Sequence, residues 1–251
     1  MTPVHPSSSP RLLRYDTLGS TNDEAKRLAQ AGAADWTVVW AREQTAGRGR
    51  GGTLFVSPPG NLYFSVILRP RSSAASAAQL GFAAALAVGR TIAARLPAGR
   101  ELRYKWPNDV LVNGFKVSGI LLESSAAHDG TLAWLVAGIG VNVASHPAET
   151  AWPATSLAAL GAAASGLEDL LRNILAAFQT EVTRWLIQGF KPIRLAWLAR
   201  AHGLGGPVRV RLPRESISGR FLDLDGEGVL LVETVAGPRR ISAGEIFPAA
   251  A

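Results

Sequence analysis

The chain has 251 residues, no cysteine, four histidines and a formal net charge of +7. This length allows one large domain with a small one beside it, and the lack of cysteine excludes disulfides, thiolate metal sites and cysteine nucleophiles. The scattered histidines lack metal-ligand spacing, and no stretch approaches the ~20 apolar residues of a membrane span. Without a signal-peptide pattern at its start, we expect a soluble, cytoplasmic protein with no histidine-built metal site.

The 26 basic residues include only four lysines, at positions 26, 105, 116 and 191. They are spread along the chain without a long run, which favours a solvated surface over a nucleic-acid site. Because arginine is so strongly preferred, each lysine marks a position where a compact, movable ammonium group can matter.

The first part of the chain predicts a tail, a strand and a helix. Residues 1–10 contain three serines and three prolines and predict a disordered tail. A short strand at Arg11–Tyr15 precedes a helix that begins near Ser20 and ends at Gly32. Thr21 and Glu24 fit a capping box. The same helix start also offers free N–H groups that can bind a small polar group, and both interpretations remain open.

A strand at Thr37–Arg42 leads into the sequence QTAGRGRGGTLF at residues 44–55. Its four glycines let the backbone approach a ligand closely, and Arg48 and Arg50 offer planar sets of donors that suit carboxylate and phosphate. This combination predicts a loop that closes over an anion. A surface linker and an arginine–glycine contact to nucleic acid remain as alternatives.

A strand at Asn61–Leu68 and one long helix at Ser76–Leu96 are expected next. Short strands then surround a turn at residues 106–109 and the hairpin dipeptide Asn113-Gly114. Simple alternation after this hairpin places two sets of side chains on opposite faces. One set is Phe115, Val117, Gly119 and Leu121, and the other is Lys116, Ser118, Ile120 and Leu122. Lys116 is then either an outward strand lysine or a cation that lines an apolar cavity.

The apolar stretch at residues 132–143 predicts a strand in which Gly138 and Gly140 mark a bulge or a close ligand approach. It lacks the third glycine and the following helix of a dinucleotide site. Helices at 167–188 and 193–200 follow. Beyond Gly203, short strands at 208–212, 217–224, 229–233 and 239–242 predict a small appended barrel.

Four stretches, read together, resemble biotin protein ligases, the biotin–(acetyl-CoA carboxylase) ligase family. They are STN at 20–22, QTAGRGRGG at 44–52, KWPND at 105–109 with FKVSGILLE at 115–123, and GIGVN at 138–142. The sequence GEIF at 244–247 fits the end of that family's SH3-like barrel. The resemblance covers nearly the whole chain from about Arg11.

The resemblance implies an α+β fold, in which a mixed β-sheet packed with helices, of the class II synthetase-like type, forms a catalytic domain at residues 11–203. A small SH3-like β-barrel at 204–251 would follow it. The implied reaction joins biotin and ATP, with Mg²⁺, as biotinyl-5′-AMP and then acylates one lysine of a biotin carboxyl carrier protein. A homodimer is left open.

The resemblance also implies roles for residues that match the family's motifs. Lys116 and Arg48 would be catalytic. Biotin contacts would come from Ser20, Thr21, Asn22, Gln44, Arg48, Gly49, Arg50, Lys116, Gly119 and Leu121. Nucleotide contacts would come from Arg50, Phe55, Lys105, Asn108, Lys116 and Asn142, with Phe55 where the family often has tryptophan. No metal held by protein ligands is expected.

Two departures from the family pattern carry expectations. Gly51 and Thr53 stand where the family loop often has further basic residues, which predicts weaker electrostatic closure over the adenylate. The residues before Arg11 leave no room for the helix-turn-helix domain of some members, so operator binding is not expected. A lipoate–protein ligase and a nucleic-acid-binding protein remain the alternative functions.

Overall fold

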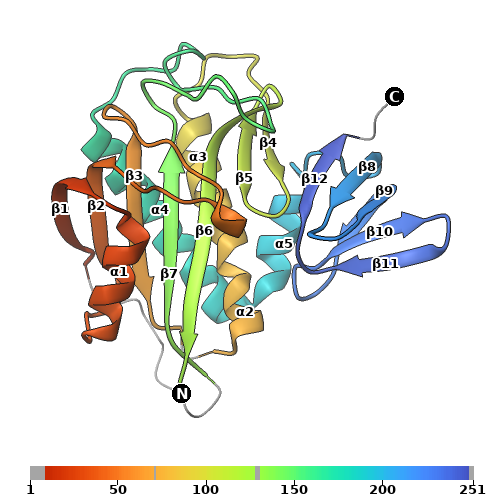
Figure 1. Ribbon diagram of the computed structural model, residues 1–251, viewed down its shortest axis with the longest axis horizontal. Helices are drawn as coiled ribbons and strands as arrows, with labels where there is room; N and C mark the ends of the chain where they lie inside the picture. Colours follow the sequence, from red (N-terminus) through yellow and green to blue (C-terminus); the bar gives the residue numbers. More distant parts are fainter. Residues whose placement is uncertain (1–8, 71, 128–130, 249–251) are drawn as a thin grey trace.

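The structure, a computed structural model, describes residues 9–70, 72–127 and 131–248. Its larger part is a mixed seven-stranded sheet in the order β1-β2-β3-β7-β6-β5-β4 (Figure 1). β1 and β2 are parallel, and all other neighbours are antiparallel. The strands are β1 (Arg11–Leu18), β2 (Thr37–Gln44), β3 (Leu62–Leu68), β4 (Leu102–Lys105), β5 (Asp109–Val112), β6 (Phe115–Ala126) and β7 (Leu132–Val141). Most of the expected disordered tail, residues 1–8, lies outside the described residues.

Helices cover both faces of this sheet. They are α1 (Thr21–Gln30), α2 (Ala74–Ala78), α3 (Leu80–Ala93), α4 (Leu167–Gln188) and α5 (Phe190–Leu198). α1 packs on β2, β3 and β7 from one side, whereas α3 packs on β4 to β7 from the other and is itself covered by α4 and α5 (Figure 1). None of the described helices is long and apolar enough to cross a membrane.

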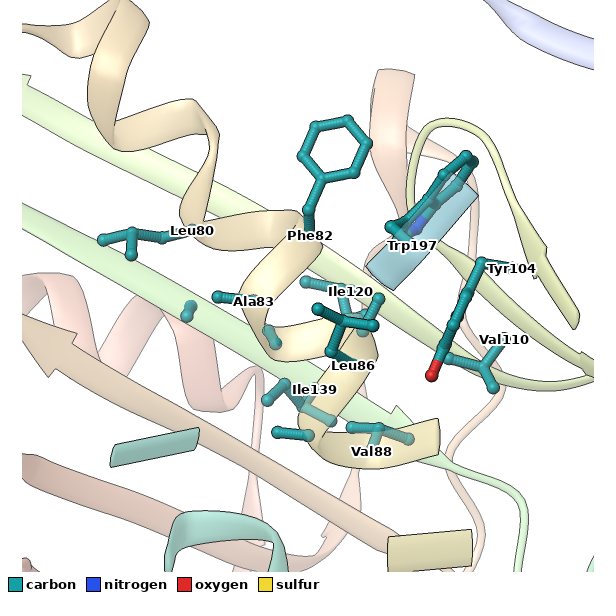
Figure 2. Packing of buried hydrophobic residues seen from close by; sticks show 14 of the residues in the cluster. Leu80, Phe82, Ala83, Leu86, Val88, Tyr104, Val110, Ile120, Ile139 and Trp197 are labelled. Atoms are coloured by element: carbon teal, nitrogen blue, oxygen red, sulfur yellow. The ribbon is translucent and has the colours of Figure 1, made fainter. Parts of the chain in front are cut away.

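The main core lies between the sheet and α3 (Figure 2). Small residues let this helix approach the strands closely: a Cβ atom added to Gly89 would lie 2.6 Å from Cε1 of Tyr104, and one added to Gly81 would lie 3.3 Å from Cδ1 of Leu122. Large side chains fill the space around the helix, and examples are Leu80, Phe82, Leu86, Ile120, Ile139 and Trp197. The alanine-rich sequence thus follows from the close helix–sheet distance.

The expected single helix at 76–96 is wrong, because two helices, α2 and α3, meet at Gln79. Gln79 keeps helical dihedral angles, φ −62° and ψ −22°. Its buried side chain accepts a hydrogen bond from Nε1 of Trp185 (2.7 Å) and donates one to the carbonyl of Gly226 (3.2 Å). The joint therefore ties α3 to α4 and to the C-terminal sheet.

The β5–β6 hairpin does not have the simple side-chain alternation that was expected, so that expectation is wrong. Its turn is as expected, with positive φ at Asn113 (51°) and Gly114 (82°). A bulge follows, because Leu111 pairs with Lys116 while its neighbour Val110 pairs with Ser118. One extra residue on β6 reverses the alternation beyond it. Consequently Lys116 shares the face of Gly119 and Leu121, whereas Val117, Ile120 and Leu122 face the helical core.

The C-terminal part is a five-stranded antiparallel sheet in the order β11-β10-β9-β8-β12. Its strands are β8 (Pro207–Arg211), β9 (Ser216–Leu224), β10 (Leu230–Thr234), β11 (Gly237–Ile241) and β12 (Glu245–Pro248). The expected small β-domain is present, and within the described residues no pairing of β11 with β12 closes it into a barrel. It lies beside α5 and β4 (Figure 1).

Candidate active site

A cavity of about 850 Å³ lies over the α1 side of β6 and β7. The start of α1, the segment between β2 and β3, the loop after β7 and the C-terminal sheet all contribute to its walls. In Figure 1 the orange segment between β2 and β3 crosses in front of β7 and β6. The lining includes every residue that the family motifs assigned except Lys105: Ser20, Thr21, Asn22, Gln44, Arg48, Gly49, Arg50, Phe55, Asn108, Lys116, Gly119, Leu121 and Asn142.

Glycines form the floor of this cavity. Gly119 of β6 pairs with Gly140 of β7, and Leu121 pairs with Gly138. A Cβ atom on Gly140 would lie 2.6 Å from the ring of Phe55, and one on Gly138 would collide with Oδ1 of Asn22. Side chains of the protein itself approach these strands closely, and the expected approach of a ligand stays a prediction.

The end of the cavity near α1 is a neutral hydrogen-bonding cluster. Gln44 Oε1 accepts hydrogen bonds from the backbone N–H (2.8 Å) and the hydroxyl (3.0 Å) of Thr21. Ser65 Oγ lies 2.6 Å from Oδ1 of Asn22, to which it donates, and 2.8 Å from the Thr21 hydroxyl. Three of these side chains are buried, so their mutual bonds hold them in fixed orientations.

The expected capping box at this helix start is wrong. Ser20, not Thr21, is the N-cap residue, and its side chain makes no capping hydrogen bond. The carboxylate of Glu24 instead pairs with Arg27 (2.7 Å) and accepts a hydrogen bond from Tyr15 (3.0 Å). The short polar residues at the start of α1 therefore serve the cavity rather than the helix end.

Arg69 anchors the other end of α1. Its guanidinium donates to the carbonyls of Ala29 (2.9 Å), Ala33 (2.8 Å) and Ala133 (2.8 Å). These carbonyls belong to the end of α1, the turn after it and β7. By satisfying them, Arg69 fixes the helix against the sheet and so fixes Thr21 and Asn22 at the cavity.

Two carboxylates hold Arg48 in place. Nη2 of Arg48 lies 2.5 Å from Oδ1 of Asp23 and 3.7 Å from Oε2 of Glu123. Glu123 also accepts hydrogen bonds from Asn22 (2.8 Å) and Lys26 (2.7 Å). Burial raises the pKa of Asp23, but hydrogen bonds from Lys26 and Arg48 outweigh it, so that the pKa is lowered. The loop arginine is thus paired with the ionised carboxylate of Asp23.

Lys116 stands at the opposite, cationic end of the cavity. Its Nζ lies 2.6 Å from Oδ1 of Asp109, whose Oδ2 lies 3.0 Å from Nζ of Lys105. Burial raises the pKa of Asp109, yet the neighbouring Lys116 and Lys105 outweigh it and leave the pKa below its ordinary value. Asp109 is therefore ionised between the two lysines.

Arg50 connects the loop to the C-terminal sheet. Its Nη1 donates a hydrogen bond to the carbonyl oxygen of Gly244 (3.0 Å). Burial lowers the pKa of Arg50, and the nearby charges of Asp109 and Glu245 partly offset this effect. The guanidinium keeps its charge in any case, because the ordinary pKa of arginine is so high.

Lys105 lies outside the cavity lining. It is fully buried, with Nζ 4.6 Å from the ring centroid of Trp152 and 3.3 Å from Oε1 of Glu245.

The amides of Asn108 and Asn142 line the cavity and also donate to the backbone carbonyls of Ile120 (2.5 Å) and Thr155 (3.0 Å). Phe55 packs edge-on against Tyr63 with ring centroids 6.3 Å apart.

Ser65, Asp109 and Glu123 take part in this site but were not predicted from the sequence. Ser65 is the single short polar side chain in the strand LYFSVIL, and such a residue signals a hydrogen-bonding partner at the buried face. In the sequence, Asp109 was explained fully as a turn residue, so no role at the site was predicted for it. Glu123 ends the stretch FKVSGILLE, which carried the resemblance without suggesting a role for the carboxylate.

A neutral hydrogen-bonding end, a cationic end and a glycine–arginine loop between them define a site that can bring two anionic groups together away from water. Residues 16–142 match the biotin/lipoate A/B protein ligase family. The chain belongs to this family. Residues 203–247 match the biotin protein ligase C-terminal domain, which agrees with the predicted resemblance to biotin protein ligases.

The individual relatives are biotin ligases. The chain is 43% identical over 237 residues to a biotin–(acetyl-CoA-carboxylase) ligase of Paracoccus denitrificans, a match that covers 91% of this chain and 96% of that one. It is 37% identical over 242 residues to the bifunctional ligase/repressor BirA of Bacillus subtilis, covering 94% of this chain and 73% of that one.

Solved structures agree with the family. Biotin protein ligase from Aquifex aeolicus in complex with biotin and ATP superposes with a TM-score of 0.79 at 28% identity, covering 94% of this chain and 97% of that one. The Leishmania major enzyme in complex with biotinyl-5-AMP superposes with a TM-score of 0.65 at 25% identity, covering 94% of this chain and all of that one. The expected fold class is confirmed.

Proposed function

We propose that the chain activates biotin with ATP as biotinyl-5′-AMP and transfers the biotinyl group to a lysine of a biotin carboxyl carrier protein in the cytoplasm. The observation that carries this proposal is a cavity that joins a neutral hydrogen-bonding end to a cationic end. Residues 11–203 would be the catalytic domain and residues 204–251 an accessory domain that completes the cavity wall.

The neutral end suits the ureido ring of biotin, which presents one carbonyl and two N–H groups. Ser20, Thr21, Asn22 and Gln44 would hold this ring, because hydroxyl and amide groups can both donate and accept hydrogen bonds. The floor of Gly119 and Leu121 would carry the apolar part of the vitamin. Such a slot, apolar with a few convergent polar groups, is typical of small-molecule sites.

The cationic end suits the first chemical step. A carboxylate oxygen of biotin attacks the α-phosphorus of ATP, a new O–P bond forms, and the bond to pyrophosphate breaks. Lys116 and Arg48 would act here as catalytic residues, because they neutralise two anions that must meet and the charge that develops between them. Arg50 and Gly49 belong to the loop that closes over both substrates.

The nucleotide would lie beside Phe55, Asn108 and Asn142. Lys105 would contribute indirectly, because it is buried behind Asp109 and does not line the cavity. In the second step the deprotonated amine of the acceptor lysine attacks the carbonyl of the mixed anhydride, an amide bond forms and AMP leaves. Excluding water protects the anhydride until the acceptor arrives.

Mg²⁺ would enter with ATP. Among the described residues no group of three or more histidine, aspartate or glutamate side chains could hold a metal ion. Mg²⁺ commonly binds through substrate phosphates and water with few protein ligands, so this donor set fits a metal carried by the nucleotide. It would neutralise phosphate charge when bound.

Biotin-dependent exchange of pyrophosphate into ATP, with Mg²⁺ present, tests the first step. Lys116→Ala should lower the exchange rate at least about 100-fold, because a charge-stabilising group at the reacting atoms is lost. Lys191→Ala, which removes an exposed lysine of α5, is the matched control. Absence of exchange in the wild type would remove the proposed reaction, and full activity of Lys116→Ala would remove the role of Lys116.

The two alternative functions can be tested with the same protein. Lipoate in place of biotin distinguishes a lipoate ligase, because only the preferred acid supports exchange. A nucleic-acid contact through the loop has less support, since Arg48 already pairs with Asp23 and Arg50 donates to Gly244. A salt-titrated gel shift would reveal such binding directly.

A further inference from the structure

Five alternating charges run from the cavity into the C-terminal sheet, and we call them the charge ladder. In order they are Lys116 of β6, Asp109 of β5, Lys105 of β4, Glu245 of β12 and Arg211 of β8. The successive N–O distances are 2.6, 3.0, 3.3 and 2.8 Å. The ladder therefore joins the proposed catalytic lysine to two strands that follow it by about a hundred residues in the chain.

Lys105 and Asp109, in the middle of the ladder, are too deeply buried for water to replace their ionic partners. The side chains of Lys105 and Asp109 are 0% and 5% exposed, whereas Lys116, Glu245 and Arg211 are 28%, 35% and 55% exposed. A buried charge is tolerated only while it is paired, so Lys105 needs both of its carboxylates and Asp109 both of its lysines. Trp152 and Phe247 further enclose the ammonium of Lys105.

We propose that Glu245 is a positioning residue for the reaction, acting on Lys116 through Lys105 and Asp109. The inference rests on the proposed function, because it assigns Lys116 to the reacting atoms. A lysine ammonium on a flexible four-carbon stem has no fixed direction of its own, and Asp109 supplies the fixed partner. Glu245 neutralises Lys105 from the other side, so that Asp109 is shared with Lys116 instead of being drawn to Lys105.

Glu245→Gln tests this role without adding bulk or emptying the core. Without the carboxylate, Asp109 becomes the sole counter-ion of Lys105 and holds Lys116 less well. We expect kcat for biotin-dependent ATP–pyrophosphate exchange to fall about tenfold, the size expected for a modest misplacement of a reacting group. KM for ATP and for biotin should not rise, because the substitution removes a negative charge from the ladder and both substrates are anions.

The matched control is Glu215→Gln, the same change of charge in the C-terminal part. Glu215 makes an exposed ion pair with Arg239 (3.3 Å) and takes no part in the ladder. Exposed pairs contribute little, so this variant should match the wild type. An unchanged kcat in Glu245→Gln would overturn the inference, and so would a raised KM with unchanged kcat, which would show a substrate contact instead of positioning.

A double-mutant cycle shows whether Glu245 acts through Asp109 or independently of it. The double variant Asp109→Asn/Glu245→Gln should be no slower than Asp109→Asn alone, because the ion pairs of the described residues connect Glu245 to Lys116 through Lys105 and Asp109. The inference would be overturned if Glu245→Gln slowed the Asp109→Asn variant by the same factor by which it slows the wild type. If Asp109→Asn does not fold, the Glu245→Gln variant decides alone. A lower kcat with KM values that do not rise supports the inference, and an unchanged kcat overturns it. Wild-type protein without any exchange would instead contradict the proposed function.

Discussion

Three glycines determine how closely side chains can approach the sheet at the candidate site. Gly119, Gly138 and Gly140 lie on neighbouring strands, and their missing side chains make room for Asn22 and the ring of Phe55. None of the three has the positive φ that favours glycine. They are therefore required by space and not by backbone conformation, so alanine at these positions changes the cavity without straining the strand.

Gly138→Ala should weaken biotin binding selectively. The added Cβ would displace Asn22, whose Oδ1 accepts from Ser65 and whose Nδ2 donates to Glu123. We expect KM for biotin to rise about tenfold, the cost of roughly one lost hydrogen bond, while KM for ATP stays unchanged. Steady-state kinetics of the exchange reaction measure both constants.

Gly226→Ala is the control for Gly138→Ala, because a Cβ there would meet nothing within 4 Å. An unchanged KM for biotin in Gly138→Ala would show that Asn22 does not contact the vitamin. A parallel rise in both constants would point to general damage of the cavity floor.

The family motifs located most of the residues that line the cavity, and their limits have physical causes. Thirteen of the fourteen residues that they assigned line one cavity, and Lys105 alone does not. Its position could not be read from the sequence, because whether a strand lysine faces solvent, a cavity or a buried carboxylate depends on pairing across the sheet. For the same reason Asp109 was explained as a turn residue although it is the partner of two lysines.

The loop between β2 and β3 shows how an element depends on a few backbone conformations. Gly51 and Gly52 have φ of 64° and 77°, so an arginine at Gly51 would be strained. Thr53, at φ −62° and ψ 140°, has ordinary dihedral angles, is exposed and lines the cavity. Position 53 is therefore the one at which the missing basic residue can be restored without strain.

Thr53→Arg should slow the release of biotinyl-5′-AMP roughly two- to fivefold, the range for an exposed ion pair. The added guanidinium attracts the adenylate phosphate, and the effect should shrink at high salt. Dissociation of labelled adenylate from the enzyme measures the rate. Thr53→Gln, of similar size but uncharged, is the control, and equal release from both variants would contradict electrostatic closure of the loop.

Strongly amphipathic helices were predicted well, whereas breaks within helices and bulges within strands were not. The helix expected at 167–188 is α4 with the same bounds. The bulge at Val110/Leu111 was missed, because one extra residue in a strand leaves no trace in a pattern of alternating side chains. That omission put Lys116 on the wrong face and left its role open between an outward lysine and a cavity cation.

The molecule as a whole should lose stability between pH 10 and 12. Burial raises the pKa of Tyr63 and of Tyr104 from 10.0 to about 12. Below pH 10 both phenols are protonated in the folded and the unfolded chain. Above it the unfolded chain ionises first, so the stabilisation that is fully present below pH 10 is lost as the pH rises to about 12.

Urea unfolding from pH 9 to 11, followed together with tyrosinate absorbance, measures this loss. Tyr104→Phe should make the fall of the urea midpoint with pH less steep, because one buried phenol no longer ionises on unfolding. Tyrosinate that forms in the folded protein near pH 10 for all three tyrosines would contradict the expectation.

The wall that the C-terminal sheet adds to the cavity has a consequence for synthesis on the ribosome. Residues 20–142 supply the floor, the neutral end and Lys116, but Arg211, Gly244 and Glu245 are translated much later. A nascent chain that has already folded its seven-stranded sheet still has an open-sided pocket, and its ladder lacks Glu245 and Arg211. The wall of the cavity is therefore complete only once the strands of the C-terminal sheet have been translated.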